Sequence, residues 1–303
     1  MNGVLVIDKP AGFTSHDVVN RVRRILQHRS VGHLGTLDPM ATGVLPLVTG
    51  SLTRLAQFYT ASEKCYEGTI RFGFATDTYD AEGEPTSPLQ EITLREEEVQ
   101  KIAERFRGVI EQMPPPFSAK KIHGVPAYKL ARKQKEVALK PVQVEIKEFD
   151  LLEIGDNRAR FRARVASGTY MRSVAHDMGQ ALGCGAHLES LRRTAVAEFT
   201  LEDAHTLEKL AEMASAAPES VFIHPRKLLP EFPSVGADEA NAARIRAGRT
   251  VNLPEHSRAR LVKVFAGQRD LLCIASRVAG TLFHPKIVFA TESCAQAADA
   301  PRR

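Results

Sequence analysis

The stretch Gly32-His33-Leu34-Gly35-Thr36-Leu37-Asp38-Pro39-Met40-Ala41-Thr42-Gly43 places a single carboxylate in a glycine-rich loop between apolar residues. Taken alone, Asp38 before Pro39 is typical of a turn, because aspartate favours turns and the residue before a proline is pushed away from helical angles. The chain lacks the sequence signatures of a phosphate-binding loop, a zinc protease, a serine hydrolase or a dinucleotide site. Asp38 is therefore the first candidate for a catalytic residue.

Regular elements are predicted on both sides of this loop. Before it, Thr14-x-x-Asp17 is a capping-box pattern, and the apolar residues that follow have helical spacing, which predicts a helix over residues 14–26. After it, residues 66–72 alternate in character with period two, which predicts a strand that carries Tyr66 on its more apolar face. The loop thus connects a helix to a region of strands.

Charge is distributed unevenly along the middle of the chain. Residues 76–99 hold eight acidic side chains and one basic one, an arrangement typical of a solvated face. Residues 117–141 then hold seven Lys and Arg against one Glu, and the predicted strand 158–165 places four arginines on one face. Either basic run alone is as typical of an ordinary solvated surface as of a nucleic-acid-binding one. The two runs together favour a surface that follows a phosphate backbone. We expect a nucleic acid as the ligand.

Composition sets wider limits. The chain has 303 residues, 43% of them hydrophobic and 25% charged, with a net charge of +5, which is typical of one large or two smaller globular domains. Its four cysteines have spacings that suit neither a zinc site nor a disulfide scaffold, and no apolar stretch approaches the roughly 18 residues of a membrane span. We expect a cytoplasmic protein with reduced thiols and no membrane segment.

The C-terminal half adds further elements. Strands are predicted over residues 142–154 and 158–165, a helix over 169–182, and a second helix that begins at Thr200-x-x-Asp203. The proline-rich residues 225–233 mark the expected end of the main domain. An alanine-rich helix over 238–247 and strand patterns at 261–265, 271–278 and 287–289 suit a small β-barrel-like domain. The last dozen residues are expected to be a flexible tail.

The sequence strongly resembles the bacterial tRNA pseudouridine-55 synthases, the TruB family. The matches follow the family's order over about residues 3–200. The matching segments are Leu5-Val6-Ile7-Asp8-Lys9-Pro10-x-Gly12-x-Thr14-Ser15, the Asp38 stretch through Pro46, Lys64-x-Tyr66, Pro115-Pro116-Phe117-Ser118-Ala119, Ala127-Tyr128-Lys129-Leu130-Ala131-Arg132, Gly168-Thr169-Tyr170-Met171-Arg172 and Leu191-Arg192-Arg193.

The resemblance implies an α+β fold, in which a mixed, largely antiparallel sheet is flanked by helices and followed by a small C-terminal PUA-like β-barrel domain. The catalytic domain would span residues 1–230, with a basic RNA-binding insertion at about 117–141. The PUA-like RNA-binding domain would span 234–290, and residues 291–303 would be the tail.

The implied function is isomerisation of uridine 55 in the T loop of tRNA to pseudouridine. The base would be flipped out, detached from ribose C1′, turned and rejoined through C5. The resemblance implies an enzyme without a cofactor or metal ion, whose partner is the T arm of tRNA. It implies no obligate protein partner, and we expect a monomer.

The motif match also implies roles for particular residues. Asp38 would be the nucleophile and Arg172 its ion-pair partner. The remaining residues implied to bind the substrate are His33, which would displace the base, Tyr66, which would pack on it, Tyr170 and Leu191, which would line the pocket, and Lys9 and Lys64, which would contact phosphates or support loops.

The chemistry of these side chains agrees with the implied roles. Burial raises the pKa of an aspartate, whereas a neighbouring guanidinium lowers it and keeps the nucleophile ionised. A tyrosine with a reference pKa of about 10 is a poor base at neutral pH. We therefore favour packing for Tyr66, with proton transfer from C5 as the lesser alternative. Without the motifs, Arg172 would be assigned to a helix surface and Tyr66 to the core.

Two other functions stay open on the sequence. A pseudouridine synthase acting on ribosomal RNA has the same catalytic requirements, and the RNA that becomes modified separates the two. A non-catalytic RNA-binding protein that assists tRNA folding belongs to a different class. Whether activity depends on Asp38 separates that class from an enzyme.

Overall fold

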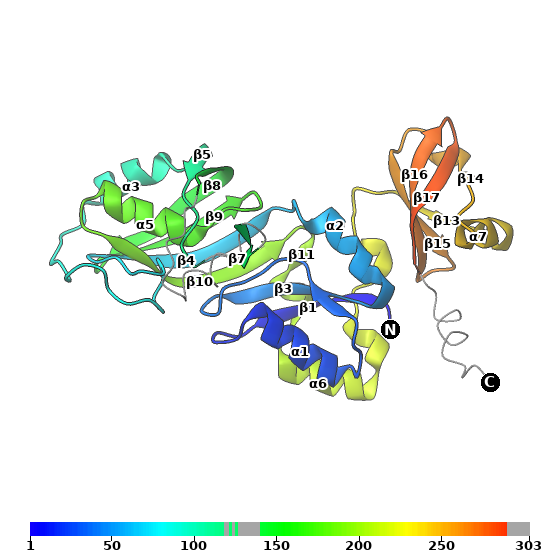
Figure 1. The fold of residues 1–303 in the computed structure, drawn as a ribbon, viewed down its shortest axis with the longest axis horizontal. Coiled ribbons are helices and arrows are strands. Elements are labelled where there is room, and N and C mark those ends of the chain that lie inside the picture. Colours follow the sequence, from blue (N-terminus) through cyan, green and yellow to red (C-terminus); the bar gives the residue numbers. More distant parts are fainter. Residues whose placement is uncertain (118–120, 123–124, 127–139, 290–303) are drawn as a thin grey trace.

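The computed structural model describes residues 1–117, 121–122, 125–126 and 140–289. Most of the predicted insertion at 117–141 and all of the predicted tail at 291–303 lie outside the described residues. Within the insertion only the short strands β6 (Lys121–Ile122) and β7 (Val125–Pro126) are described, and they pair with each other. The described residues form two larger sheets and the helices that cover them (Figure 1).

The larger sheet has ten strands, eight of them in the order β12-β1-β3-β10-β4-β9-β8-β5, while β2 pairs with β3 and β11 with β10. Two of its pairings, β1 with β12 and β3 with β10, are parallel, and the others are antiparallel. The predicted mixed, largely antiparallel sheet is confirmed. Its strands are β1 (Gly3–Lys9), β2 (Val31–His33), β3 (Thr42–Thr49), β4 (Lys64–Phe72), β5 (Gly108–Gln112), β8 (Val142–Gly155), β9 (Arg158–Val165), β10 (Ala186–Val196), β11 (Phe199–Thr200) and β12 (Ala204–His205).

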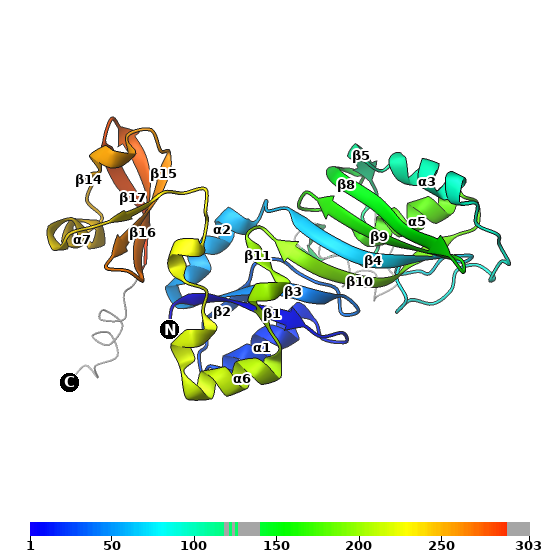
Figure 2. The ribbon, with the colours of Figure 1, turned by 180° about the vertical axis from the view of Figure 1, so that it is seen from behind.

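Four helices cover one face of this sheet in two groups. Helices α1 (Ser15–Ile25) and α6 (Leu207–Ala216) lie at the β1 end, whereas α3 (Glu96–Glu104) and α5 (Met171–Ala181) lie at the β8 and β9 end (Figure 1). Apolar side chains from all four helices share one core with the sheet. The two halves of the sheet meet at β10, which pairs with β3 on one side and β4 on the other (Figure 2). The helices therefore leave the middle of this face free for a site.

Local sequence explains why several elements begin where they do. The Thr14 hydroxyl accepts a hydrogen bond from the backbone of Asp17, and the Asp17 carboxylate accepts one from the backbone of Thr14, so the predicted capping box starts α1. The second predicted box is also formed, but it opens only a 3₁₀ turn, Leu201–Asp203. The helix that follows is α6, and its cap is Thr206. The predicted helix start at Thr200 was wrong, because the short strand β12 lies between the 3₁₀ turn and the first residue of α6, Leu207.

The C-terminal sheet contains five strands in the order β13-β15-β16-β17-β14. It curls around its own apolar core, which it shares with α7 (Glu239–Arg246), and it lies at one end of the molecule (Figure 1). This curled sheet with one helix agrees with the predicted PUA-like domain. Its strands are β13 (Ser234–Gly236), β14 (Val251–Asn252), β15 (Leu261–Ala266), β16 (Asp270–Ala279) and β17 (Leu282–Val288).

A third apolar core joins the C-terminal sheet to the large sheet. Phe265 and Ile287 belong to the same buried cluster as Val4 and Val6 of β1. In addition, the guanidinium of Arg54 donates to the carbonyl of Val288 at 2.8 Å. The C-terminal sheet is therefore packed against the back of the large sheet at its β1 end.

Candidate active site

The Asp38 loop connects β2 to β3 in the middle of the helix-covered face. Ser15, at the start of α1, holds the residue before Asp38: its hydroxyl accepts from the Leu37 N–H at 2.8 Å and donates to the Leu37 carbonyl at 3.1 Å. At the other end of the loop, Gly43 has a φ of +99°, and a Cβ there would lie 2.2 Å from the carbonyl oxygen of Arg193. Only glycine fits at this position, where β3 pairs closely with β10.

The buried side chain of Arg193, on β10, holds the backbone of the same loop in place. Its side chain is fully buried, and its guanidinium donates to the carbonyls of Val44, Gly35 and Thr36 at 2.8, 3.1 and 3.1 Å. Arg193 belongs to the Leu191-Arg192-Arg193 motif, from which no role for it was predicted. Because three backbone carbonyls accept from one side chain, Arg193 fixes the path of the loop that presents Asp38.

Arg172 faces Asp38 from the second position of α5. Its Nη2 donates to Oδ1 of Asp38 at 3.1 Å, and its Nε lies 2.9 Å from Oδ2, although the Nε–H is not aligned for a hydrogen bond with it. The Arg172 side chain is only 5% exposed, so the alternative of a helix-surface residue is excluded. The guanidinium lies against both oxygens of the carboxylate that the family resemblance implies as the nucleophile.

Asp80 is a buried part of this site that the sequence analysis missed. It was grouped with the solvated acidic block, but its side chain is 5% exposed and its Oδ2 accepts from Nη1 of Arg172 at 3.3 Å. Its Oδ1 accepts from the Thr78 hydroxyl at 2.6 Å and from the Glu82 N–H at 3.1 Å. The other seven acidic residues of the block are exposed, as predicted. No local pattern distinguishes Asp80 from them.

A cavity of about 250 Å³ opens beside Asp38. Six of the eight predicted site residues line it, namely Asp38, Arg172, Tyr66, Tyr170, Leu191 and Lys64. Tyr66 and Leu191 are each 8% exposed and present apolar surface to the cavity from β4 and β10. The cavity therefore combines a carboxylate, a guanidinium and flat apolar walls, which suits a planar, uncharged ring next to a nucleophile.

The two remaining predicted residues do not line this cavity. His33 ends β2, is half-buried, and its Nδ1 accepts from the Gly35 N–H at 3.4 Å. Lys9 is fully buried, and its ammonium donates to the carbonyls of Pro10, Phe13 and Pro39 at 2.9, 2.6 and 3.0 Å. Of the two predicted roles for Lys9, the geometry favours support of the loop over a phosphate contact, because all three ammonium hydrogens already have acceptors.

Burial changes the acid–base properties of the cavity. Burial raises the pKa of Asp38 above its ordinary value, and the Arg172 guanidinium opposes this change. The charge of Asp80 adds to the rise in the pKa of Asp38. Burial and the nearby Arg193 lower the pKa of Lys64 to about 8. The ionised Asp38 that a nucleophile requires thus depends on its contact with Arg172.

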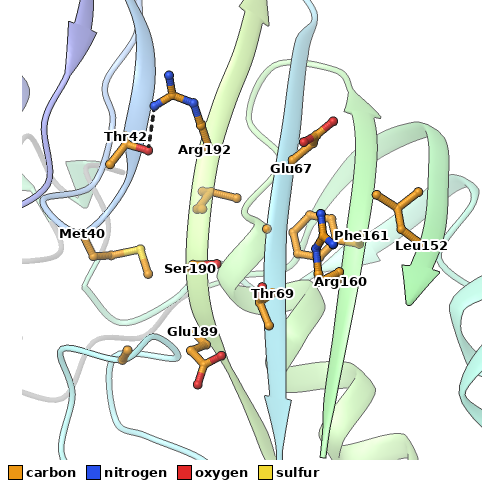
Figure 3. Close-up of a pocket in the computed structure, with 13 residues that line it drawn as sticks. Met40, Thr42, Glu67, Thr69, Leu152, Arg160, Phe161, Glu189, Ser190 and Arg192 are labelled. Atoms are coloured by element: carbon orange, nitrogen blue, oxygen red, sulfur yellow. Dashed lines mark hydrogen bonds between the residues drawn. The ribbon is translucent and has the colours of Figure 1, made fainter. Parts of the chain in front are cut away.

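A second cavity of about 310 Å³ opens on the other face of the sheet (Figure 3). Glu67 and Thr69 line it, and they alternate along β4 with Tyr66, which points to the Asp38 cavity. Its charged residues are held in ion pairs: Glu67 with Arg162, Arg160 with Glu153, Glu189 with Arg158, and Arg192 with Asp8.

The four arginines of β9 share one face, as the alternation predicts, but they do not present free positive charge. Arg160, Arg162 and Arg164 contact Glu153, Glu67 and Glu148 on the neighbouring strands β8 and β4, and Arg158 reaches Glu189 on β10, one strand further away. These pairs lie at the protein surface, on the face opposite Asp38. These ion pairs argue against this basic run as part of a phosphate-binding surface, an interpretation that stays a prediction to be tested. Sequence spacing shows the arginines but not their cross-strand partners.

The described residues hold neither a candidate metal site nor a helix that could span a membrane. They contain no group of three or more His, Cys, Asp and Glu side chains placed to hold a metal ion. Among the helices described in the structure, none is long and apolar enough to cross a membrane.

Comparisons with known proteins show the family of the chain. The family model described as TruB family pseudouridylate synthase (N terminal domain) matches residues 23–171, and the one described as tRNA pseudouridylate synthase B C-terminal domain matches residues 172–229. The chain therefore belongs to the TruB family of pseudouridylate synthases. The predicted resemblance and the predicted enzyme class are confirmed.

Two relatives and one solved structure show how similar the chain is to known proteins. The chain is 53% identical over 293 residues to tRNA pseudouridine synthase B of Solibacter usitatus, covering 95% of this chain and all of the relative. It is 40% identical to the protein of the same name from Aquifex aeolicus, covering 88% and 92% of the two chains. Its fold is similar to a chain of a Cbf5-Nop10-Gar1 complex, with a TM-score of 0.71, 25% identity and coverage of 96% and 86%.

Proposed function

We propose that this protein converts uridine 55 in the T loop of tRNA to pseudouridine, with Asp38 as the nucleophile. The observation that carries the proposal is the contact of both Asp38 carboxylate oxygens with Arg172, at the wall of a cavity of about 250 Å³. A volume just below the roughly 300 Å³ of small-molecule sites suits a single flipped-out base. The relatives named tRNA pseudouridine synthase B support tRNA as the substrate.

The reaction requires one bond to break and one to form. The bond between N1 of uracil and C1′ of ribose is cleaved, the ring turns, and a new bond joins C5 to C1′. The hydrogen on C5 leaves as a proton and N1 gains one, so the product is an isomer of the substrate and no cofactor is consumed. Asp38 attacks the nucleoside as the nucleophile, and the bond it forms breaks again as the isomer is completed, so the free carboxylate is restored. Arg172 keeps that carboxylate ionised and oriented.

The other cavity residues have supporting roles in this proposal. Tyr66 packs on the base, since its ring lies in the cavity wall and is 8% exposed. Tyr170 and Leu191 complete the walls, and Lys64 is the cation at the cavity edge that is available to a phosphate. His33 acts before chemistry, by helping to displace the base from the stacked loop. Extrusion of a base costs a few kcal/mol, which stacking on Tyr66 offsets.

We propose that residues 1–230 form the catalytic domain and residues 234–290 an RNA-binding domain. The charge of the second region supports this division, because residues 234–289 hold nine Lys and Arg against four Asp and Glu. Its cation Lys263 is buried and donates to the carbonyls of Arg226 and Leu228, so it serves the fold, whereas Arg246 and Arg249 are exposed. The monomeric state and the cytoplasmic location stay predictions.

One experiment separates this function from its rivals. Purified protein is incubated without cofactor with an unmodified tRNA transcript and, separately, with ribosomal RNA transcripts, and pseudouridine is mapped by position. We expect product at position 55 of the tRNA alone. Product confined to ribosomal RNA would show a different substrate. Tight tRNA binding without any product would favour the non-catalytic RNA-binding protein.

A further inference from the structure

We infer that Gln112 is a positioning residue for the Asp38–Arg172 pair, an inference that rests on the proposed function. Gln112 is the last residue of β5 and is 1% exposed. Its Oε1 accepts from the Tyr170 N–H at 2.8 Å and its Nε2 donates to the Tyr170 carbonyl at 3.1 Å. One side-chain amide thus binds both backbone groups of the residue that lies two positions before Arg172.

Helix α5 needs such an external support at its start. The residue at its N-cap position is Tyr170, and its side chain caps none of the free N–H groups of the first turn. Gly168, two residues before Tyr170, has a φ of +87°. Glycine adopts this conformation easily, but it also restricts the backbone less than any other residue does. The sequence therefore supplies no local signal that fixes where the first turn begins. The amide of Gln112 supplies it from another strand.

Two further contacts tie the same two segments together. The Ser173 hydroxyl donates to the Met113 carbonyl at 2.6 Å, and Nη2 of Arg172 donates to the Phe117 carbonyl at 2.9 Å. The segment after β5 is therefore bound along the first turn of α5, on which Arg172 lies. A displacement of this turn moves the guanidinium relative to Asp38, whose contacts are only 2.9 and 3.1 Å long.

The side chain of Gln112 does not line the Asp38 cavity, so it acts through Tyr170 and Arg172 and not on the substrate. The strand itself does not require this amide, because the backbone of Gln112 already pairs with Val142 of β8. A buried amide is costly unless its donor and acceptor are both satisfied, and here both are satisfied by the helix start. The geometry therefore assigns the amide to the placement of α5.

The test compares Gln112→Met with Gln112→Glu. Methionine has a similar length but loses both hydrogen bonds, whereas glutamate keeps the acceptor for the Tyr170 N–H and loses the donor. The single-turnover rate at saturating unmodified tRNA transcript, the dissociation constant for that transcript and the pH dependence of the rate are measured. We expect Gln112→Met to lose about 100-fold in rate, the order of magnitude for a 1 Å misplacement, and Gln112→Glu to be intermediate.

Two further results are expected. Affinity for the transcript should change by less than about 2-fold, because Gln112 lies outside the cavity. The acid limb of the rate profile should move to higher pH, because a displaced guanidinium no longer lowers the pKa of Asp38. The same rise should be visible by ¹³C NMR of the Asp38 carboxyl in the free protein, a readout that needs no turnover.

Thr49→Val is the matched control. Thr49 is fully buried, and its hydroxyl accepts from the Gly3 N–H at 2.9 Å, but it does not line the Asp38 cavity. We expect this variant to lose thermal stability and keep the rate, the acid limb and the Asp38 pKa. If Gln112→Met and Gln112→Glu fold and match the wild type in rate and in the Asp38 pKa, the inference is wrong. It is also wrong if Thr49→Val reproduces their rate loss.

Failure of the proposed function would look different. In that case the wild-type protein makes no pseudouridine at position 55, and the NMR comparison of the Asp38 pKa still decides the role of Gln112. If Gln112→Met does not fold, Gln112→Glu gives the decision, since glutamate has nearly the same size and retains one of the two bonds.

Discussion

Nη1 of Arg172 lies 3.3 Å from Oδ2 of Asp80, so the guanidinium that faces Asp38 is shared with a second carboxylate. The same Nη1 also donates to the Thr78 carbonyl at 3.1 Å. Asp80 therefore holds the guanidinium at Nη1, while Nη2 and Nε face Asp38, and so limits its freedom. Its negative charge has a second effect, because it raises the pKa of Asp38. Asp80 thus contributes to the geometry of the site and opposes ionisation of the nucleophile.

The variant Asp80→Asn separates these two effects. We expect the single-turnover rate at neutral pH to fall about 10-fold or more, because Arg172 loses a fixed partner. We expect the acid limb of the pH–rate profile to move to lower pH, because removal of a neighbouring negative charge lowers the pKa of Asp38. The measurement is the single-turnover rate as a function of pH. An acid limb that moves to higher pH would contradict this, since displacement of Arg172 would then outweigh the removed charge and Asp80 would act on Asp38 mainly through geometry.

The variant Arg172→Lys tests geometry at constant charge. Lysine cannot contact both oxygens of Asp38 while also reaching Asp80 and the Phe117 carbonyl, as the guanidinium does. We expect a loss of about 100-fold in single-turnover rate and little change in tRNA affinity. Because Arg172 is buried, we also expect a stability loss of about 1–3 kcal/mol, measured by denaturant titration. A wild-type rate in this variant would show that the pair needs charge alone.

The arginines of β9 should contribute little to RNA binding. Arg162 is paired with Glu67 at the surface, where the two side chains are 60% and 41% exposed. We expect Arg162→Ala to change tRNA affinity by less than about 2-fold and stability by at most about 1 kcal/mol. The check is the dissociation constant at several salt concentrations. A decrease of about one in the slope of log affinity against log salt would show a phosphate contact that the ion pair hides.

The C-terminal sheet should contribute phosphate contacts. Arg246 and Arg249 are exposed at the end of α7. We expect the double substitution of both by alanine to weaken tRNA binding and to reduce the salt slope by up to about 1.8, while the saturated single-turnover rate is unchanged. Point substitution is the sharper test than deletion, because deletion would expose the apolar core that Phe265 shares with Val4. Unchanged affinity would contradict RNA binding by this region.

Local sequence signals predicted the elements that depend on local interactions. The Thr14 capping box gives the start of α1, and the alternation from Tyr66 gives β4. Strand β10, which joins the two halves of the sheet, carries no such signal. Register shifts between Leu188 and Ser190 and between Arg193 and Ala195 interrupt its period-two pattern. A strand with two register shifts does not show the regular alternation by which strands are predicted from sequence.

The site was predicted to the extent that motifs carry it. The motif match placed Asp38, Tyr66 and Arg172 together, and the structure brings all three to one cavity. It could not show the role of Asp80 or Gln112, since each acts through a contact with a residue more than fifty positions away. It also left the environment of Lys9 open, because burial depends on the fold and not on the residue type.

The measurement that tests the central claim most directly is the single-turnover reaction of Asp38→Asn with an unmodified tRNA transcript, with pseudouridine mapped at position 55. Asparagine keeps the size of the side chain and removes the charge that attacks. The account predicts no detectable pseudouridine at any time point and a tRNA dissociation constant close to that of the wild type. Pseudouridine formation at a rate near that of the wild type would contradict the account, because another group would then carry the reaction.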